Sequence, residues 1–276
     1  MELLKQLPLL FLIIVTLGGP SPCLGDDPIP VHETFKLDSK VLGETRTLTV
    51  WLPPAYQPEG ADKYPIIYMP DGGVKEDFPH IANTIAKLVA NHSIAPVILV
   101  GIENTQRRRD LTGPSNVESD KQIAPATDGA NEFREFIESE LFPEVGKRYR
   151  ITEDRAILGE SAAGLFIVET LFLRPKMFNR YIAMDPSLHW NDHELAKRAP
   201  ERIPGLAGHE IKFWFASSDA IDIYPHTATL AKALKAHAPD NLKWTYLPQP
   251  SEHHSTIFRA TKEKAFAASL AQPKRK

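Results

Sequence analysis

The feature that most constrains the fold of this chain is a regular alternation of short apolar runs with amphipathic stretches. Buried strands are predicted at Tyr64 to Met69, Pro96 to Ile102, Arg180 to Met184, Ile211 to Ala216 and Leu242 to Leu247, with helical spacing between most of them. Strands that alternate with helices form a parallel sheet covered by helices on both faces. The sequence therefore predicts an α/β fold, whose active site belongs at the carboxyl ends of the strands.

Length and charge favour a single globular domain without a nucleic-acid partner. The 276 residues suit one α/β domain, and no composition break or repeat interrupts the chain from Asp26 onward, so the domain is predicted to span residues 26–276. The 32 Lys and Arg residues against 35 Asp and Glu residues leave a formal net charge of -3. Such a chain has no overall positive field to attract nucleic acid.

The N-terminus has the pattern of a secretory signal peptide. Lys5 precedes a nearly continuous apolar run from Leu7 to Gly18, and Cys23 and Gly25 then offer small side chains for a cleavage site. This pattern predicts a cleaved signal over residues 1–25 and a secreted or periplasmic location, with an uncleaved anchor as the alternative. The apolar run is short for a span, and none follows it, so no stable membrane insertion is expected. Cleavage removes Cys23, the only cysteine, which excludes a thiol nucleophile, a disulfide and thiolate metal ligands.

The strongest chemical motif lies between a predicted strand, Arg155 to Leu158, and an apolar helix, Leu165 to Leu173. It reads Gly159-Glu160-Ser161-Ala162-Ala163-Gly164. A sharp strand-to-helix turn of this kind projects a serine above the sheet as a nucleophile, and it requires small neighbours. Ala163 stands where the usual G-x-S-x-G motif has its last glycine. The alternative interpretation makes Ser161 an ordinary helix cap.

Candidates for the acid and the base of a catalytic triad follow Ser161 in the expected order. Asp219 and Asp222 come after the strand that ends at Ala216, and Asp219 is preferred by a small margin because it follows the strand more tightly. His253 and His254 follow the last predicted strand, and spacing alone does not separate them. A neutral imidazole is needed to accept the serine proton, and a carboxylate is needed to orient that imidazole.

Other polar clusters give weaker signals. His189 and His193 have the spacing of two metal ligands on one helix face, but their surroundings are typical of a loop and no H-E-x-x-H motif is present. We therefore predict no metal and no cofactor. The arginines from Arg107 to Arg109 could bind an anionic or oxygen-rich substrate, or Arg109 could simply pair with Asp110.

Taken together, these motifs resemble the putative-esterase branch of the α/β-hydrolase superfamily, which includes esterase D and S-formylglutathione hydrolase, feruloyl esterases and enterochelin esterases. The resemblance runs from about Phe35 to the end of the chain. Its marks are Leu42 to Arg46, Val50 to Tyr56, Tyr64 to Gly73, Gly101 to Asn104, Arg109 to Thr112, Phe133, Phe136-Ile137, Glu140-Leu141, Pro143, Tyr149-Arg150 and Arg155 to Ser161. No long insertion separates Met184 from Ile211, so an α/β-hydrolase fold without a large lid is expected.

The resemblance implies a serine esterase that cleaves a small-molecule carboxylic ester through an acyl-enzyme. It implies Ser161 as nucleophile and, from an H-x-S pattern, favours His253 over His254 as base. It also implies an oxyanion hole formed by the N–H groups of Ala162 and the Gly72-Gly73 loop. The alternatives are an acyltransferase that uses the same residues and an inactive binding protein of the same fold. The identity of the ester and the oligomeric state are left open.

Overall fold

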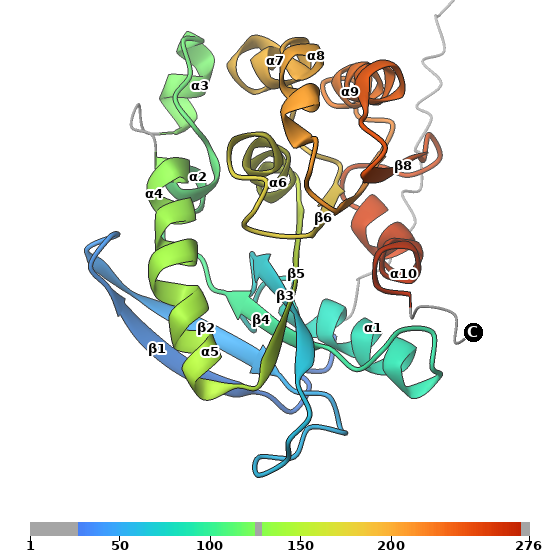
Figure 1. The fold of residues 1–276 in the computed structure, drawn as a ribbon. Coiled ribbons are helices and arrows are strands. Elements are labelled where there is room, and N and C mark those ends of the chain that lie inside the picture. Colours follow the sequence, from blue (N-terminus) through green and yellow to red (C-terminus); the bar gives the residue numbers. More distant parts are fainter. Residues whose placement is uncertain (1–26, 125–128, 272–276) are drawn as a thin grey trace, which may run out of the picture.

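The computed structural model describes residues 27–124 and 129–271, and the strands of these residues form one eight-stranded sheet (Figure 1). The predicted signal peptide, residues 1–25, lies outside the described residues. The strands are β1 (Glu33–Ser39), β2 (Glu44–Trp51), β3 (Tyr64–Pro70), β4 (Ile98–Ile102), β5 (Ile151–Glu160), β6 (Arg180–Met184), β7 (Ile211–Ser217) and β8 (Leu242–Pro248). Their spatial order is β1-β2-β4-β3-β5-β6-β7-β8. β1, β2 and β4 pair antiparallel, and every later pairing is parallel.

Helices cover both faces of this sheet, which confirms the predicted α/β fold. They are α1 (Phe78–Ala90), α2 (Arg107–Leu111), α3 (Glu118–Ile123), α4 (Gly129–Phe136), the π-helical turn η1 (Ile137–Leu141), α5 (Phe142–Arg148), α6 (Ala162–Leu173), α7 (Trp190–Lys197), α8 (Ala199–Arg202), the 3₁₀ turn η2 (Ile203–Leu206), α9 (Tyr224–His237) and α10 (Ile257–Leu270). Only short helices lie between β6 and β7, as expected for a fold without a large lid.

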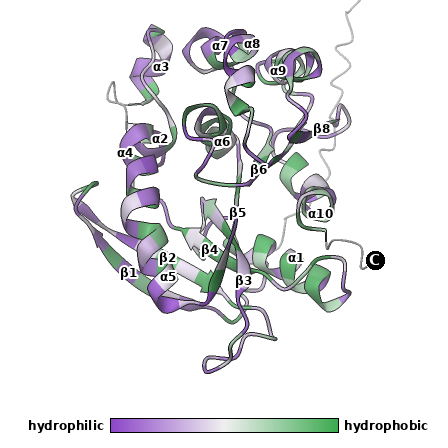
Figure 2. Ribbon diagram, viewed as in Figure 1, coloured by the Kyte–Doolittle hydropathy of each residue, from purple (hydrophilic) through white to green (hydrophobic). Residues whose placement is uncertain are grey.

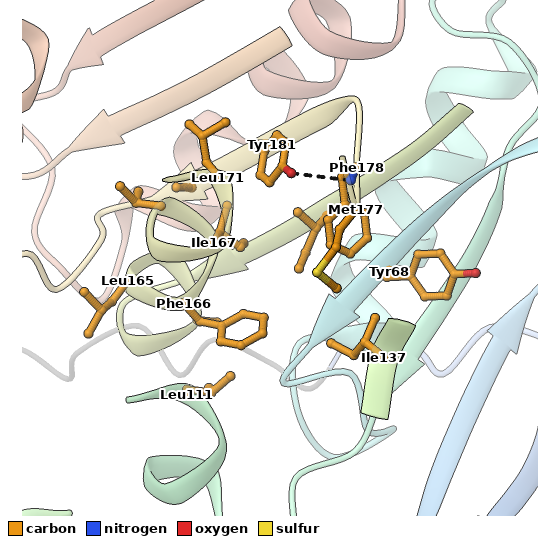
Figure 3. Packing of buried hydrophobic residues seen from close by; sticks show 14 of the residues in the cluster. Tyr68, Leu111, Ile137, Leu165, Phe166, Ile167, Leu171, Met177, Phe178 and Tyr181 are labelled. Carbon is orange, nitrogen blue, oxygen red and sulfur yellow. Dashed lines mark hydrogen bonds between the residues drawn. The ribbon is translucent and has the colours of Figure 1, made fainter. Parts of the chain in front are cut away.

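Two apolar layers hold the helices against the sheet. Alternate residues of each central strand belong to opposite layers. In β3, Tyr68 belongs to the layer that holds α4, α5 and α6 and contacts the ring of Phe142, whereas Ile67 belongs to the layer that holds α1 and α10. Figure 3 shows the first layer, where Leu171 of α6 lies beside Tyr181, whose hydroxyl accepts a 3.4 Å hydrogen bond from the backbone N–H of Phe178. Figure 2 shows that α4 is amphipathic, with hydrophilic residues on the same helix as its buried phenylalanines.

The chain departs from the sequence expectations in two places. β1 was not predicted; it is a half-exposed edge strand that pairs with β2 along its whole length. The apolar spacing from Gly129 to Arg148, with Phe133, Phe136, Ile137 and Leu141 on one face, predicts one continuous helix. In the structure this helix is interrupted by η1, where the Phe142 N–H donates to the carbonyl of Ile137, five residues earlier. Pro143 has no N–H to continue an α-helical pattern, so a π turn is accommodated there.

The parallel strands end at one edge of the sheet, and this edge carries the polar motifs. The chain leaves β3 at Asp71, β5 at Ser161, β6 at Asp185 and β7 at Ser218. β5, β6 and β7 are consecutive neighbours in the sheet. Residues that follow these three strands are therefore placed side by side, however far apart they lie in the sequence.

Candidate active site

Ser161 occupies the sharp turn between β5 and α6. Its backbone has φ 60° and ψ -118°, a left-handed conformation that is strained for a residue with a side chain. The Ser161 N–H donates to the carbonyl of Met184 at the end of β6, and the Ser161 carbonyl accepts from Leu165 in the first turn of α6. The strand, turn and helix predicted around Ser161 are therefore present.

The small residues of the motif are explained by close contacts. A Cβ at Gly159 would lie 2.5 Å from the Cβ of Ala163, and a Cβ at Gly164 would lie 2.9 Å from Pro186. Ala163 is fully buried against Gly159, so this position tolerates a methyl group because its neighbour has none. The departure from the common motif is thus accommodated by the glycine four residues earlier.

His254 contacts Ser161 directly. Its Nε2 lies 3.1 Å from Ser161 Oγ, and its Nδ1 lies 2.6 Å from Oδ2 of Asp185. The hydrogen bond to Asp185 raises the pKa of His254 above 6.5, although partial burial of the ring opposes this rise. Ser161, His254 and Asp185 thus form one continuous hydrogen-bonded chain, in which the serine oxygen faces a polarised imidazole.

Asp185 is held rigidly behind the histidine. It is completely buried and has a left-handed backbone with φ 44°. Its carboxylate accepts hydrogen bonds from the N–H and the hydroxyl of Ser218, at 2.7 and 2.6 Å, besides the contact with His254. Buried charge is stable only when it is well hydrogen-bonded, and these contacts supply that stabilisation.

Asp185 was not among the residues predicted for the site. The predicted acids, Asp219 and Asp222, follow the strand that ends at Ala216, whereas Asp185 follows the strand that ends at Met184. The signal that could have found it is the one used for Asp219, a carboxylate that directly follows a buried strand. Asp185 has the better position because β6 lies next to β5 in the sheet, whereas β7 lies one strand farther away.

The preferred base and acid of the sequence analysis form a second pair away from the serine. His253 Nδ1 lies 2.8 Å from Asp219 Oδ2, and the two side chains are 73% and 41% exposed. Adjacent residues of an extended loop point in opposite directions, and here His254 is the one that faces Ser161. Asp222 is exposed, and no hydrogen bond or ion pair joins it to either histidine. The geometry thus brings His254 and Asp185 to Ser161, and it places the predicted pair His253 and Asp219 away from it.

The two glycines predicted to form an oxyanion hole are already engaged. The Gly72 N–H donates to the carbonyl of Ile102, and the Gly73 N–H donates to the carboxylate of Glu76 at 2.7 Å. Gly72 is required for packing instead, because a Cβ there would lie 2.3 Å from the Cα of Gly101. The third predicted donor is the N–H of Ala162. This residue is the first of α6, and the amides of the first turn of a helix have no hydrogen-bond partner within the helix.

Several carboxylates surround the serine. Burial raises the pKa of Glu160 to about 8; nearby Asp77, Asp185 and Asp71 add to the rise and His254 opposes it. Arg107 pairs with Asp71 through two hydrogen bonds of 2.6 and 2.7 Å, and Arg109 pairs with Asp110, as the sequence allowed. Glu160 is therefore protonated over much of the neutral range, which limits the negative charge beside the nucleophile.

The histidines considered for metal binding do not share a helix face. The residues from Asn191 to His193 have left-handed backbone angles within α7, and the His193 ring stacks on His226 at 4.4 Å between centroids. In residues 27–124 and 129–271, no group of three or more His, Cys, Asp or Glu side chains is arranged to hold a metal ion. Among these same residues, no helix has the length and hydropathy needed to cross a membrane.

Comparison with known proteins points to esterases. The family described as "Putative esterase" matches residues 39–271. The chain is 27% identical to ferri-bacillibactin esterase BesA of Bacillus subtilis, over 84% of this chain and 80% of the relative. It is 32% identical to a siderophore triacetylfusarinine C esterase of Aspergillus fumigatus, over 61% of each chain. The crystal structure of an IroE-like serine hydrolase from Shewanella oneidensis superposes with a TM-score of 0.75 and 26% identity, covering 86% of this chain and 79% of that one.

Proposed function

Because this chain belongs to the "Putative esterase" family and is a hydrolase that acts on ester bonds, we propose that Ser161 is its nucleophile, His254 its general base and Asp185 the acid that orients the base. The observation that carries the proposal is the 3.1 Å contact between Ser161 Oγ and His254 Nε2. The 2.6 Å contact of Nδ1 with Asp185 leaves Nε2 as the unprotonated nitrogen. This is the arrangement in which an imidazole accepts a serine proton.

The reaction proceeds in two halves. His254 takes the Ser161 proton as Oγ attacks the ester carbon, and it then returns that proton to the departing alcohol, which leaves an acyl-enzyme. Water then attacks the acyl carbon with His254 again as base, and the carboxylic acid product is released from Ser161. Asp185 stabilises the charged imidazole in both halves. No metal or cofactor takes part in these steps.

Ala162 supplies a donor for the oxyanion that forms at each attack. Its N–H lies in the first turn of α6, directly after the nucleophile, where free amides and the helix dipole favour negative charge. A preorganised donor of this kind typically contributes about 3–4 kcal/mol to the stability of a tetrahedral intermediate.

We propose an ester-linked siderophore, or a fragment of one, as the substrate. The printed names of the relatives support this class, since they describe esterases of ferri-bacillibactin and of triacetylfusarinine C. The site itself is open: the His254 side chain is 42% exposed, and only short helices follow β6. An open site with polar surroundings suits a large, oxygen-rich ester better than a long lipid.

We further propose that the chain is exported and cleaved near Gly25. The support is the apolar run from Leu7 to Gly18 with small residues after it. Intact-mass measurement of exported protein should give a chain that begins near Asp26. A mature chain that retains Met1, or that carries a lipid on Cys23, would contradict the proposal.

The nucleophile is tested by substitution and labelling together. Ser161→Ala should lower kcat by several orders of magnitude without unfolding the protein, whereas Ser251→Ala, which changes an exposed serine near the histidines, should have no effect. A serine-directed phosphonate should label Ser161 in the wild type and in Ser251→Ala. Label on another serine, or retained activity in Ser161→Ala, would overturn the assignment.

The substrate class is tested with a panel of esters. Acetyl, feruloyl, S-formylglutathione and siderophore trilactone esters should be compared by kcat/KM, and the trilactone is expected to give the highest value. A higher value for any other member would contradict the siderophore proposal while leaving the triad intact. Added alcohol acceptors that increase turnover and form new esters would indicate an acyltransferase.

A further inference from the structure

Ser161 Oγ has a second polar neighbour besides His254. The hydroxyl oxygen of Ser187 lies 3.2 Å from it. Ser187 is almost buried, and its backbone N–H donates to the Ser161 carbonyl at 3.1 Å, so the loop after β6 is fastened to the nucleophile turn. The same loop carries Asp185 two residues earlier. The segment from Asp185 to Ser187 therefore contacts His254 through Asp185 and Ser161 through Ser187.

The number of protons decides the direction of the new contact. A serine hydroxyl carries one hydrogen and can accept two. When the Ser161 hydrogen points to His254 Nε2, as general-base catalysis requires, Ser161 has none left for Ser187. The Ser187 hydroxyl must then be the donor and Ser161 Oγ the acceptor.

We infer that Ser187 is a further catalytic residue, whose hydroxyl donates a hydrogen bond to Ser161 Oγ when this oxygen leaves the acyl group. The inference rests on the proposed function, in which Ser161 carries the acyl group. In that step water adds to the acyl carbon and its proton passes to His254 Nε2. The bond from the acyl carbon to Oγ then breaks, the electron pair stays on Oγ, and His254 returns the proton to it.

The hydrogen bond matters more for the release of the acyl group than for its attachment. In the acyl-enzyme, Oγ is an ester oxygen and a poor acceptor, but it gains negative charge as its bond to carbon breaks. Hydrogen bonds to charged oxygens are stronger than bonds to neutral ones, so the contact gains strength along this step. Before acylation Oγ is a hydroxyl oxygen, which already accepts well, and the gain is smaller. Only an interaction that strengthens in the transition state accelerates a step.

The test is the pre-steady-state hydrolysis of p-nitrophenyl acetate. Ser187→Ala should slow the steady-state, deacylation-limited phase roughly tenfold, the size of effect expected for one hydrogen bond to a developing charge. The burst phase, which reports acylation, should slow by no more than about threefold. Intact-mass analysis should show an acetylated protein that accumulates during turnover, and Ser187→Thr, which keeps a hydroxyl, should restore deacylation.

A matched control is Ser39→Ala, which removes an equally buried hydroxyl from the edge strand β1 and should leave both phases unchanged. A merely structural role of Ser187 would slow both phases together without trapping acyl-enzyme, and that result would overturn the inference. So would unchanged kinetics in Ser187→Ala. In each case phosphonate labelling of Ser161 would still support the proposed function, whereas failure of that labelling would remove the proposal and the inference together.

Discussion

The loop after β8 presents two neighbouring histidines, each paired with an aspartate, in opposite environments. His254 meets an aspartate that is fully buried and receives two further hydrogen bonds from Ser218. His253 contacts Asp219, which follows β7 and is 41% exposed. A histidine–aspartate contact is therefore insufficient to identify a catalytic pair. The pair of His254 and Asp185 differs from the other pair in two ways: its carboxylate is buried, and the second nitrogen of its imidazole contacts the Ser161 hydroxyl.

The largest expected difference between the pairs is in the histidines. His254→Ala should lower kcat/KM roughly 10³–10⁵-fold, because the serine loses its base and triad residues act as a unit. His253→Ala should lower it less than about threefold, since this side chain is in solvent. Steady-state kinetics of both variants on one chromogenic ester provide the measurement. Similar losses in the two variants would mean that neither pair serves Ser161.

Substitution of the two aspartates should give the second-largest difference in activity between the pairs. Asp185→Asn should lower kcat roughly 10²–10⁴-fold near neutral pH, because an amide N–H facing Nδ1 favours the wrong tautomer of His254. Asp219→Asn makes the same chemical change in the exposed pair and should retain most activity. A strong loss in Asp219→Asn together with a mild loss in Asp185→Asn would reverse the assignment.

A smaller effect is expected from the residue that holds the buried carboxylate. Ser218→Ala removes the 2.6 Å hydroxyl contact with Asp185 but keeps the N–H contact, so kcat should fall roughly three- to tenfold. Ser217→Ala is the matched control, because this neighbouring buried serine bonds to Tyr246 instead. Equal activity in the two variants would show that the hydroxyl does not position Asp185.

The pH profile offers a further comparison. Asp185 raises the pKa of His254 above 6.5, and only neutral His254 can act as a base. The acid limb of kcat/KM should therefore have its midpoint above pH 6.5, and His253→Ala should leave that midpoint in place. A midpoint well below pH 6.5 in the wild type would contradict a functional contact between His254 and Asp185.

The smallest predicted effect concerns the stability of the protein. Burial raises the pKa of Glu160 from 4.5 to about 8, so the folded protein holds a proton that the unfolded chain has lost between these pH values. The free energy of unfolding must therefore fall as pH rises through this range. Glu160→Gln removes the ionisable group and with it the loss of stability at high pH. At pH 8 its Tm should exceed that of the wild type by roughly 2–4 °C for each kcal/mol of unfolding free energy regained, whereas at pH 4.5 the two should differ little.

The control for this effect lies in the exposed pair. Asp219→Asn makes the corresponding change of a carboxylate to an amide at a position that is 41% exposed, and it should change Tm at pH 8 by much less than Glu160→Gln does. Thermal melts of wild type and both variants between pH 4.5 and 8 provide the measurement. A wild-type Tm that rises with pH relative to Glu160→Gln would contradict the raised pKa of Glu160.

The periodic segments of the fold were predictable because their signal is local. The strand from Arg180 to Met184 was predicted with its observed bounds, and the turn at Ser161 was predicted from glycine and alanine at positions that cannot hold larger side chains. β1 was not predicted because a half-exposed edge strand has no continuous run of apolar residues in its sequence. The interruption at η1 was not predicted because the same helical spacing of apolar residues continues in α4 before it and in α5 after it.

The spacing of residues was enough to predict the alternation of strands and helices, the turn that presents Ser161, and two histidines that could act as its base. These properties depend on residues close together in the chain, where periodicity and side-chain size act directly. The contact of His254, rather than His253, with the serine and the pairing of His254 with Asp185 arise from the folded arrangement of the sheet. That choice depends on the order of strands in the sheet, which places the end of β6 beside the end of β5, and on which side of an extended loop turns inward. Neither property is encoded in the spacing of residues along the chain.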